Sequence, residues 1–263
     1  MPFGAYKAFF RHVDGQFVGN DPARGPWSED ACHGGPVAGT IVRALERAVP
    51  EQQLVRLTVN FLRPVPMRGF RVETVIDKAG RAASIATATL AGEDGKRSAV
   101  AWALFQAVVS FDSLPNADVR GPDFNASVPG KFPVARALHD KPFFNAGIEV
   151  RYPPGQDHRP GPTTSWMRTL PIVEGERSTP FQSLCPLADC GNAISRNAEF
   201  GTVSFINPDL TLQVHRLPES EWLATDSISF WEPSGLGMSH SRLFDTAGPV
   251  GVALQSLMLR SAG

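Results

Sequence analysis

The chain has 263 residues, of which 42% are hydrophobic, and a formal net charge of −1 from 25 Lys plus Arg against 26 Asp plus Glu. This length suits one large domain or two small ones, and the balanced charge lacks the basic excess that binds nucleic acid, so we expect no nucleic-acid partner. No apolar segment is long enough to span a bilayer as a helix, and residues 1–12 lack a signal-peptide core, so we expect a cytoplasmic protein with no membrane span.

The first half of the chain predicts one helix followed by an antiparallel sheet. After Pro36, which a helix start tolerates, an apolar residue recurs every four positions and predicts one buried helix face. The residues of this face are Val37, Ile41, Leu45 and Val49. Alternating segments then predict strands, with a further strand part at 16–18. The predicted strands span 57–62, 70–79, 82–91 and 100–105.

A connector is expected between two units of the chain. The densest irregular stretch, rich in Gly and Pro, runs from 111 to 142. It separates an N-terminal unit at 1–110 from a C-terminal unit at 143–263. In the second unit a strand part at 148–152 comes first, and a helix shorter than that of the first unit is expected from about Pro186 to Ile194.

The two units are interpreted as copies of one pattern. LTVNFLRP at 57–64 aligns with LTLQVHRL at 210–217, an offset of 153 residues (210 − 57). AVAWALFQ at 99–106 matches GVALQSLM at 251–258 at an offset of 152 (251 − 99). Two further pairs coincide at the offset of 153, Cys32 with Cys185 and Arg43 with Arg196. One helix followed by an antiparallel meander in each copy predicts two α+β units packed into one body.

The cysteines and histidines exclude several kinds of chemistry. The three cysteines, Cys32, Cys185 and Cys190, form no Cys-x-x-Cys pair, so we expect free thiols in a reducing compartment. A small buried thiol is the favoured interpretation of Cys190, over a nucleophile. The six histidines show no metal-ligand spacing, and the chain has no nucleophile elbow and no phosphate-binding glycine loop. We therefore expect no metal and no other cofactor.

Four segments, taken in order, resemble one known family. They are His33-Gly34-Gly35-Pro36 at the head of an apolar helix, LTVNFLRPVP at 57–66, Asn207-Pro208-Asp209-Leu210-Thr211, and Gln255 followed by Arg260. Together they resemble the double-hotdog acyl-CoA thioesterases related to bacterial thioesterase II. The resemblance implies an α+β double hotdog, in which a curved antiparallel sheet wraps each long helix. It also implies that the thioester lies between the two halves, near a helix N-terminus.

The resemblance further implies which residues react. In that family they are an Asp at the start of the second-half helix, a Thr at the start of the following strand and a Gln on the last strand. Matched position by position, these fall on Asp189, Asn207 and Gln255. At Asn207 a carboxamide replaces the hydroxyl, but it can still bind a water as donor and acceptor.

The repeat offers an internal comparison for these residues. Asp189 pairs with Pro36 and Gln255 with Ala103, so the second half carries a polar residue where the first carries none. This asymmetry predicts a single site built mainly by the second half. Ordinary structural roles stay open: Asp189 as a helix cap, Gln255 as an exposed strand residue and Asn207 as a turn residue.

Backbone amides at a helix start would stabilise the oxyanion that forms during thioester hydrolysis. The candidates are Gly191 in the second half, and Gly34 and Gly35 in the first. His33 is either a ligand contact or a plain helix cap. Because a helix dipole favours an ionised carboxylate, we expect Asp189 to be charged at neutral pH and to position a water rather than to act as a strong base.

These observations predict a cytoplasmic acyl-CoA thioesterase that uses direct attack of water, with no covalent intermediate. The acyl group is carried by CoA or by the pantetheine arm of a carrier protein. The sequence does not give the acyl chain length or the oligomeric state, and a homo-oligomer is possible. Two alternatives remain. One is a double hotdog that binds an acyl group or CoA without turnover, which the Asn at position 207 keeps open. The other is an enoyl-CoA hydratase, which needs a His beside an acidic residue, whereas Asp189 has no His near it in sequence.

Overall fold

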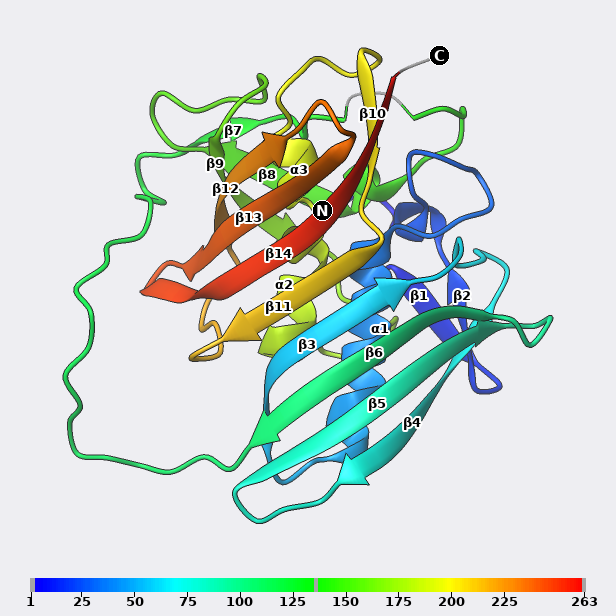
Figure 1. Ribbon diagram of the computed structural model, residues 1–263, viewed down its shortest axis with the longest axis vertical. Helices are drawn as coiled ribbons and strands as arrows, with labels where there is room; N and C mark the ends of the chain where they lie inside the picture. The colour runs from blue at the N-terminus through cyan, green and yellow to red at the C-terminus, as the bar shows by residue number, and fades with distance from the viewer. Residues whose placement is uncertain (1–2, 135–136, 262–263) are drawn as a thin grey trace.

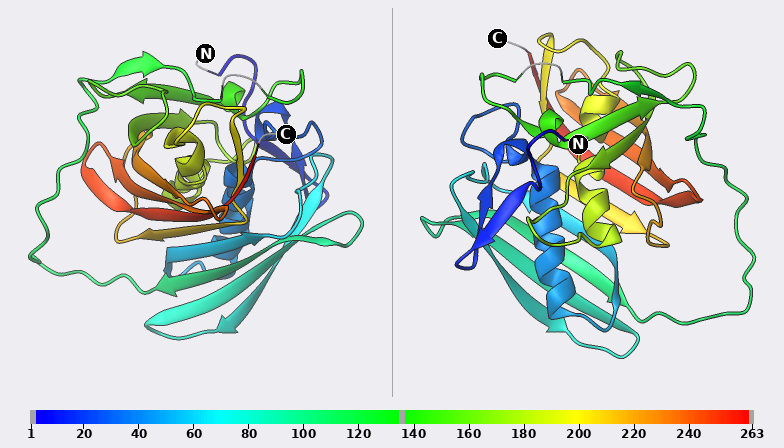
Figure 2. Two further views of the ribbon diagram at one scale, coloured as in Figure 1. Left: turned by 45° about the horizontal axis from the view of Figure 1, so that its top comes forward. Right: turned by 180° about the vertical axis from the view of Figure 1, so that it is seen from behind.

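The computed structural model describes residues 3–134 and 137–261, and within them the strands form one continuous sheet. The strand order is β1-β2-β4-β5-β6-β3-β11-β14-β13-β12-β9-β8-β7, and β10 pairs with β14 beside this path. Figure 1 shows the helices behind this curved sheet, and Figure 2 shows from behind that α1 and α2 lie next to each other.

The first half contains one long helix and six strands, as predicted for its main elements. They are β1 (Phe10–Val13), β2 (Gln16–Gly19), the 3-10 turn η1 (Asp21–Ala23), α1 (Gly34–Ala48), β3 (Gln53–Phe61), β4 (Phe70–Lys78), β5 (Ala83–Gly92) and β6 (Arg97–Gln106). The predicted apolar face of α1 is confirmed, because all four of its residues are buried. Burying this face against the sheet is what holds the helix in place.

The second half repeats this plan after a long loop that runs around the outside of the molecule (Figures 1 and 2). Its elements are β7 (Val128–Gly130), the 3-10 turn η2 (Phe144–Gly147), β8 (Ile148–Tyr152), β9 (Thr163–Thr169), α2 (Pro180–Ala188), α3 (Gly191–Ile194), β10 (Val203–Ile206), β11 (Asp209–Val214), β12 (Leu223–Trp231), β13 (Leu236–Asp245) and β14 (Gly248–Ser261). Because the sheet runs unbroken through both halves, the unit boundaries at 110 and 143 stay predictions.

The two halves meet where β3 pairs with β11. Thr58 lies directly opposite Thr211 in this antiparallel pair, and their hydroxyl oxygens are 3.1 Å apart. The two threonines are 153 residues apart (211 − 58), which is the offset found in the sequence. A pseudo-two-fold axis therefore passes between Thr58 and Thr211, and the strand order is mirrored about it.

The second-half helix differs from its prediction. It begins at Pro180 instead of near Pro186, ends at Ala188, and resumes as the four-residue α3. The Thr179 hydroxyl caps its start by accepting a hydrogen bond from the backbone N–H of Gln182 over 3.2 Å. Proline at the first helical position has no N–H to leave unpaired, so this start is favourable.

This earlier start changes which residues of the helices correspond. From helix start to the paired threonine there are 24 residues in the first half (58 − 34) and 31 in the second (211 − 180). The seven additional residues lie in the part of the second half that contains β10. The predicted match of Cys32 with Cys185 is therefore wrong, because Cys32 precedes α1 whereas Cys185 lies inside α2. The match of Pro36 with Asp189 is wrong for the same reason, because Pro36 lies in the first turn of α1 whereas Asp189 follows the last turn of α2.

The inner faces of the two half-sheets, which pack against the helices, differ in polarity. In the first half the buried face of β5 and β6 is mainly alanine: Ala86, Ala88, Ala99, Ala101 and Ala103. In the second half the buried face of β9, β12 and β13 carries hydroxyls: Ser165, Thr225, Ser227, Ser229, Ser239 and Ser241. The same architecture therefore encloses an apolar interior in one half and a polar interior in the other.

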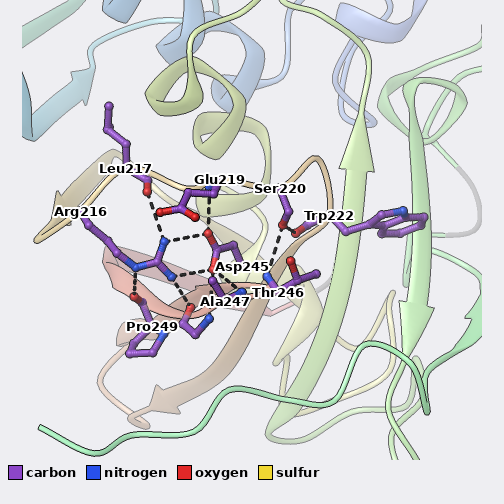
Figure 3. A network of polar contacts seen from close by, with 10 residues as sticks. Arg216, Leu217, Glu219, Ser220, Trp222, Asp245, Thr246, Ala247 and Pro249 are labelled. Atoms are coloured by element: carbon purple, nitrogen blue, oxygen red, sulfur yellow. Dashed lines mark hydrogen bonds and ion pairs between the residues drawn. The ribbon is translucent and has the colours of Figure 1, made fainter.

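An ion pair fixes the loops at one end of the second-half sheet (Figure 3). Arg216, just after β11, donates to both carboxylate oxygens of Asp245, over 2.8 and 2.6 Å. The backbone N–H groups of Glu219 and Ala247 donate to the same carboxylate over 2.8 and 2.9 Å. These bonds connect the β11–β12 loop to the β13–β14 turn.

No helix among the described residues is long and apolar enough to cross a membrane. Over the same residues, no group of three or more His, Cys, Asp or Glu side chains is arranged to hold a metal ion. The cytoplasmic location, the lack of a nucleic-acid partner and the homo-oligomer stay predictions.

Candidate active site

Three predicted site residues from separate parts of the second half meet at one carboxyl group. Asp189 follows α2, Asn207 precedes β11 and Gln255 lies in the middle of β14. Asn207 Nδ2 donates to Asp189 Oδ1 over 2.8 Å, and Gln255 Nε2 donates to the same oxygen over 3.2 Å. Gln255 Nε2 also donates to the backbone carbonyl of Asp189 over 3.0 Å. Two carboxamides thus donate to the same oxygen of the Asp189 carboxyl.

Asn192, which the sequence analysis missed, orients both carboxamides. Its backbone N–H donates to Gln255 Oε1 and its side-chain Nδ2 donates to Asn207 Oδ1, each over 3.0 Å. Gln255 is 2% exposed and points inward, in line with its buried neighbours at alternate positions of β14. The exposed-strand interpretation of Gln255 is therefore wrong. No spacing in the sequence marks Asn192, which owes its position to the short α3.

The first half contributes the N-terminal end of α1. His33 Nδ1 lies 3.2 Å from Asp189 Oδ2. A Cβ atom at Gly34 would lie 2.8 Å from the same oxygen, and one at Gly35 would lie 2.8 Å from the Pro186 Cα. Only glycine permits these approaches, which bring the start of α1 against the end of α2. We name Asp189, Asn192, Asn207, Gln255 and His33 the Asp189 cluster.

His33 is both a helix cap and a contact of the cluster. Its Nδ1 accepts a hydrogen bond from the Gly35 N–H over 3.2 Å, and its ring stacks on Phe144 with centroids 4.0 Å apart. It lies 156 residues from Asp189 in sequence (189 − 33). No histidine lies near Asp189 in sequence, but the fold brings His33 Nδ1 within 3.2 Å of its carboxyl.

Burial sets the protonation of both groups. It raises the pKa of Asp189 to about 7, although hydrogen bonds from Asn207, the Gly35 N–H and Gln255 act to lower it. Burial also lowers the pKa of His33 to about 3, so its ring is neutral at physiological pH. The expectation of a fully ionised Asp189 is wrong, because the residue follows the C-terminal end of α2 and desolvation outweighs its hydrogen bonds.

The neighbouring thiol is buried, as predicted. Cys190 is buried and its Sγ donates to the Pro186 carbonyl over 3.1 Å. Burial, with a smaller contribution from Asp189, raises the pKa of this thiol well above its usual value, so it does not form the reactive thiolate. Within the described residues all three cysteines are free, which confirms the expectation of free thiols.

The predicted oxyanion donors do not have equal support. A Cβ at Gly191 would lie 2.5 Å from Ser241 Oγ and 2.9 Å from Ser239 Oγ, so this glycine lets α3 pack closely on β13. The Gly34 N–H begins the 15-residue α1 and has no acceptor among the described residues. The Gly35 N–H is already bonded to His33 Nδ1, so Gly34 is the better placed donor. The oxyanion roles of Gly34, Gly35 and Gly191 all stay predictions.

Access to the cluster is narrow. Asp189 is 5% exposed, while His33, Gly34 and Asn207 are half-buried around it. A cavity of about 690 Å³ lies elsewhere, between β9, the start of α2 and the loop after β11. A substrate would therefore reach the carboxyl past these three half-buried residues.

Comparison with known proteins identifies a family. Residues 23–111 match the acyl-CoA thioesterase N-terminal domain, and residues 117–259 match the acyl-CoA thioesterase C-terminal domain. A comparison with curated proteins found no match.

Several solved structures share the fold. A candidate thioesterase from Novosphingobium aromaticivorans is 22% identical with a TM-score of 0.71, and the match covers 98% of this chain and 100% of that one. A conserved protein of unknown function with a hot dog fold from Alicyclobacillus acidocaldarius is 19% identical, with a TM-score of 0.70 and 97% of each chain covered. An acyl-CoA thioesterase II from Mycobacterium marinum is 17% identical, with a TM-score of 0.62 and 95% of this chain and 94% of that one covered. These likenesses confirm the predicted α+β double hotdog.

Proposed function

Because the chain belongs to the acyl-CoA thioesterase family, we propose that it hydrolyses acyl-CoA at the Asp189 cluster, between the two halves, by direct attack of water. The observation that carries this proposal is a buried carboxyl with a pKa of about 7, held by two carboxamides and facing the start of a long helix. A general base works best when its pKa lies near the working pH.

The two oxygens of Asp189 have different roles in this mechanism. Oδ1 accepts hydrogen bonds from Asn207 and Gln255, which fix the plane of the carboxyl. Oδ2 faces His33 Nδ1 and Gly34 and is the oxygen that takes a proton. A proton on Oδ2 can be shared with the neutral His33 ring. The two carboxamides therefore position the base, whereas the sequence analysis expected the Asn207 carboxamide to bind the water.

The reaction balances without a covalent enzyme intermediate. The water oxygen bonds to the thioester carbonyl carbon as Asp189 takes one of its protons. The carbon–sulfur bond then breaks, and the CoA thiolate receives that proton, which regenerates the ionised Asp189. The products are a carboxylic acid, which ionises in solution, and free CoA thiol.

The negative charge on the carbonyl oxygen needs a donor during this attack. The Gly34 N–H lies at the positive end of the α1 dipole, next to Asp189. Loss of one such donor typically raises a barrier by about 2.7–4 kcal/mol. Gly34 therefore serves the site twice, through its missing side chain and through its amide.

Release of free thiol from a panel of acyl-CoA esters, from acetyl to palmitoyl, tests the proposal. Wild type should show turnover that peaks at one chain length, and Asp189→Ala should lower kcat by about 100- to 10,000-fold, the usual contribution of a general base. Asp157→Asn, an exposed carboxylate paired with Arg159, is the matched control and should keep full activity. Full activity in folded Asp189→Ala would exclude this site.

One observation favours a second function. The contact between His33 and Asp189 places a histidine beside a carboxyl, the combination that an enoyl-CoA hydratase needs. Loss of the enoyl absorbance of crotonyl-CoA would reveal hydratase activity. We expect no such loss. Saturable acyl-CoA binding with neither thiol release nor hydration would instead indicate a binding protein.

A further inference from the structure

Asn192 presents two hydrogen-bond donors to the rest of the Asp189 cluster. It is 6% exposed, and its Oδ1 accepts from the Ala193 backbone N–H over 2.7 Å. This bond leaves Nδ2 as the atom that faces Asn207 Oδ1, while the Asn192 backbone N–H faces Gln255 Oε1. A backbone N–H and an amide nitrogen can only donate, so the direction of both bonds is fixed by Asn192.

The two carboxamides are held by these donors in one of their two possible orientations. An amide group has an oxygen at one end and a nitrogen at the other, which are similar in shape but opposite in hydrogen bonding. Asn207 and Gln255 each place the oxygen on Asn192 and the nitrogen on Asp189 Oδ1. The Asp209 carbonyl, which accepts from Asn207 Nδ2 over 3.2 Å, favours the same orientation. Turning either amide by 180° would set its oxygen against the carboxyl and remove a donor from the ionised form.

The break between α2 and α3 gives Asn192 this position. The Cys190 N–H donates to the Leu187 carbonyl over 3.0 Å, so the chain tightens after α2 before α3 begins. Gly191 then lets α3 lie close to β13 and β14, because a Cβ there would lie 2.5 Å from Ser241 Oγ and 3.3 Å from Gln255 Oε1. The Asn192 N–H thereby comes within hydrogen-bond distance of a strand residue 63 positions away.

We propose that Asn192 is a positioning residue of the hydrolysis, and that its side chain is needed because position 207 carries a carboxamide. This inference rests on the proposed function, in which Asp189 is the base. A hydroxyl rotates about its C–O bond and can turn its proton toward the carboxyl unaided, whereas the two ends of a carboxamide are fixed. The Asn192 side chain is therefore required when residue 207 is asparagine and dispensable when it is threonine.

The surroundings of Asp189 make its pKa sensitive to the Asn207 orientation. Burial raises this pKa to about 7, and the Asn207 hydrogen bond is the largest of the contributions that lower it. Among the described residues, the other titratable side chains next to Asp189 are His33, Cys185 and Cys190. Burial lowers the pKa of the histidine to about 3 and raises the pKa of both thiols, so all three are uncharged near pH 7.

A double-mutant cycle tests the dependence on residue 207. Asn192→Ala alone should lower kcat by about tenfold, the value of a hydrogen bond that acts on a charged group, with KM within about twofold. In an Asn207→Thr background the same change should lower kcat by less than about twofold. Such non-additivity measures the coupling between the two positions. An equal loss in both backgrounds would leave Asn192 with a structural role alone and overturn the inference.

The isosteric change Asn192→Asp replaces the side-chain donor with an acceptor and keeps the backbone N–H. The Asn207 oxygen would then face a second oxygen, so the midpoint of the kcat/KM profile should move up by about one pH unit. Asn197→Asp is the matched control on the exposed Asn197, whose Nδ2 donates to the Ser229 carbonyl over 2.9 Å. It should leave the midpoint unchanged. An unmoved midpoint in Asn192→Asp, or the same shift in the control, would contradict the inference.

Titration of the Asp189 carboxyl carbon by 13C NMR gives a readout that needs no turnover. Wild type should titrate near pH 7, and Asn192→Asp about one pH unit higher. This difference without thiol release from any acyl-CoA would refute the proposed function and keep Asn192 as the residue that orients the carboxamides. Thiol release without the difference would keep the proposed function and overturn the inference. If thermal unfolding shows that Asn192→Asp does not fold, the cycle with Asn192→Ala decides.

Discussion

Two aspartates lie buried in the second half, and their surroundings have opposite effects on their protons. Asp245, 1% exposed, is bonded to the Arg216 guanidinium and to three backbone N–H groups (Figure 3). Asp189, 5% exposed, has neutral donors and a neutral histidine around it. Burial alone would raise the pKa of Asp245, but Arg216 and the amides outweigh it, and that pKa lies below its usual value.

The comparison separates a structural carboxylate from a reactive one. Asp245 is ionised and fully paired, so it holds two loops and has no proton to exchange near neutral pH. No cation among the described residues pairs with Asp189, so burial keeps its pKa near 7 at a cost to stability. In this half, the presence or absence of an arginine decides which role a buried aspartate can take.

The largest expected effect is on stability, and it has opposite signs at the two aspartates. Asp245→Ala should lower the free energy of unfolding by about 3–5 kcal/mol, because it leaves Arg216 without its carboxylate. Asp189→Asn should raise stability at pH 8. The folded state holds the Asp189 proton more tightly than the unfolded chain, so stability falls as pH rises through 7 in wild type. Urea unfolding at pH 8 measures the free energy of unfolding of both variants. An equal loss of stability in the two variants would contradict the distinction between the two aspartates.

The second prediction is the pH dependence of catalysis. If Asp189 is the base, kcat/KM should rise about tenfold per pH unit well below 7, or about 50-fold from pH 5 to 7, and level off above it. His33, with a pKa of about 3, does not titrate in this window. Steady-state rates on one acyl-CoA from pH 5 to 9 give the profile. A flat profile in a stable protein would mean that ionisation of Asp189 is not required.

The third prediction makes the second half resemble the first at one position. Gln255 and Ala103 are equivalent by the repeat, so Gln255→Ala should lower kcat by roughly 10- to 100-fold, because the Asp189 carboxyl loses one of its positioning donors. Ala103→Gln is the reverse change in the first half. It places a carboxamide in an apolar interior and should lower Tm with little effect on kcat per folded molecule.

Patterns in the sequence predicted the first-half helix and the strand pair that joins the two halves. The four-residue period of α1 and the offset that pairs Thr58 with Thr211 can both be read from the chain. The start of α2 cannot, because the helix is buried on most sides and has no polar face to set a period.

The site likewise contains residues that the sequence indicates and contacts that only the fold creates. The resemblance identified Asp189, Asn207 and Gln255 as candidates, and the structure brings them together. The contact with His33 joins residues 156 positions apart, and no local pattern encodes it. The raised pKa of Asp189 depends on burial by the whole fold, which is why its charge at neutral pH was wrongly predicted.

The smallest expected effect concerns Asn207, where the family pattern has threonine. Asn207 Nδ2 donates to Asp189 Oδ1 over 2.8 Å while its Oδ1 accepts from Asn192. A threonine hydroxyl can also donate and accept, but its shorter side chain would lengthen one of these bonds, so Asn207→Thr should lower kcat by less than about tenfold. Asn207→Ala removes both bonds and should cost more. If Asn207→Thr instead raised kcat, the carboxamide would be a handicap that this chain tolerates, and Asp189 would be better oriented by a hydroxyl.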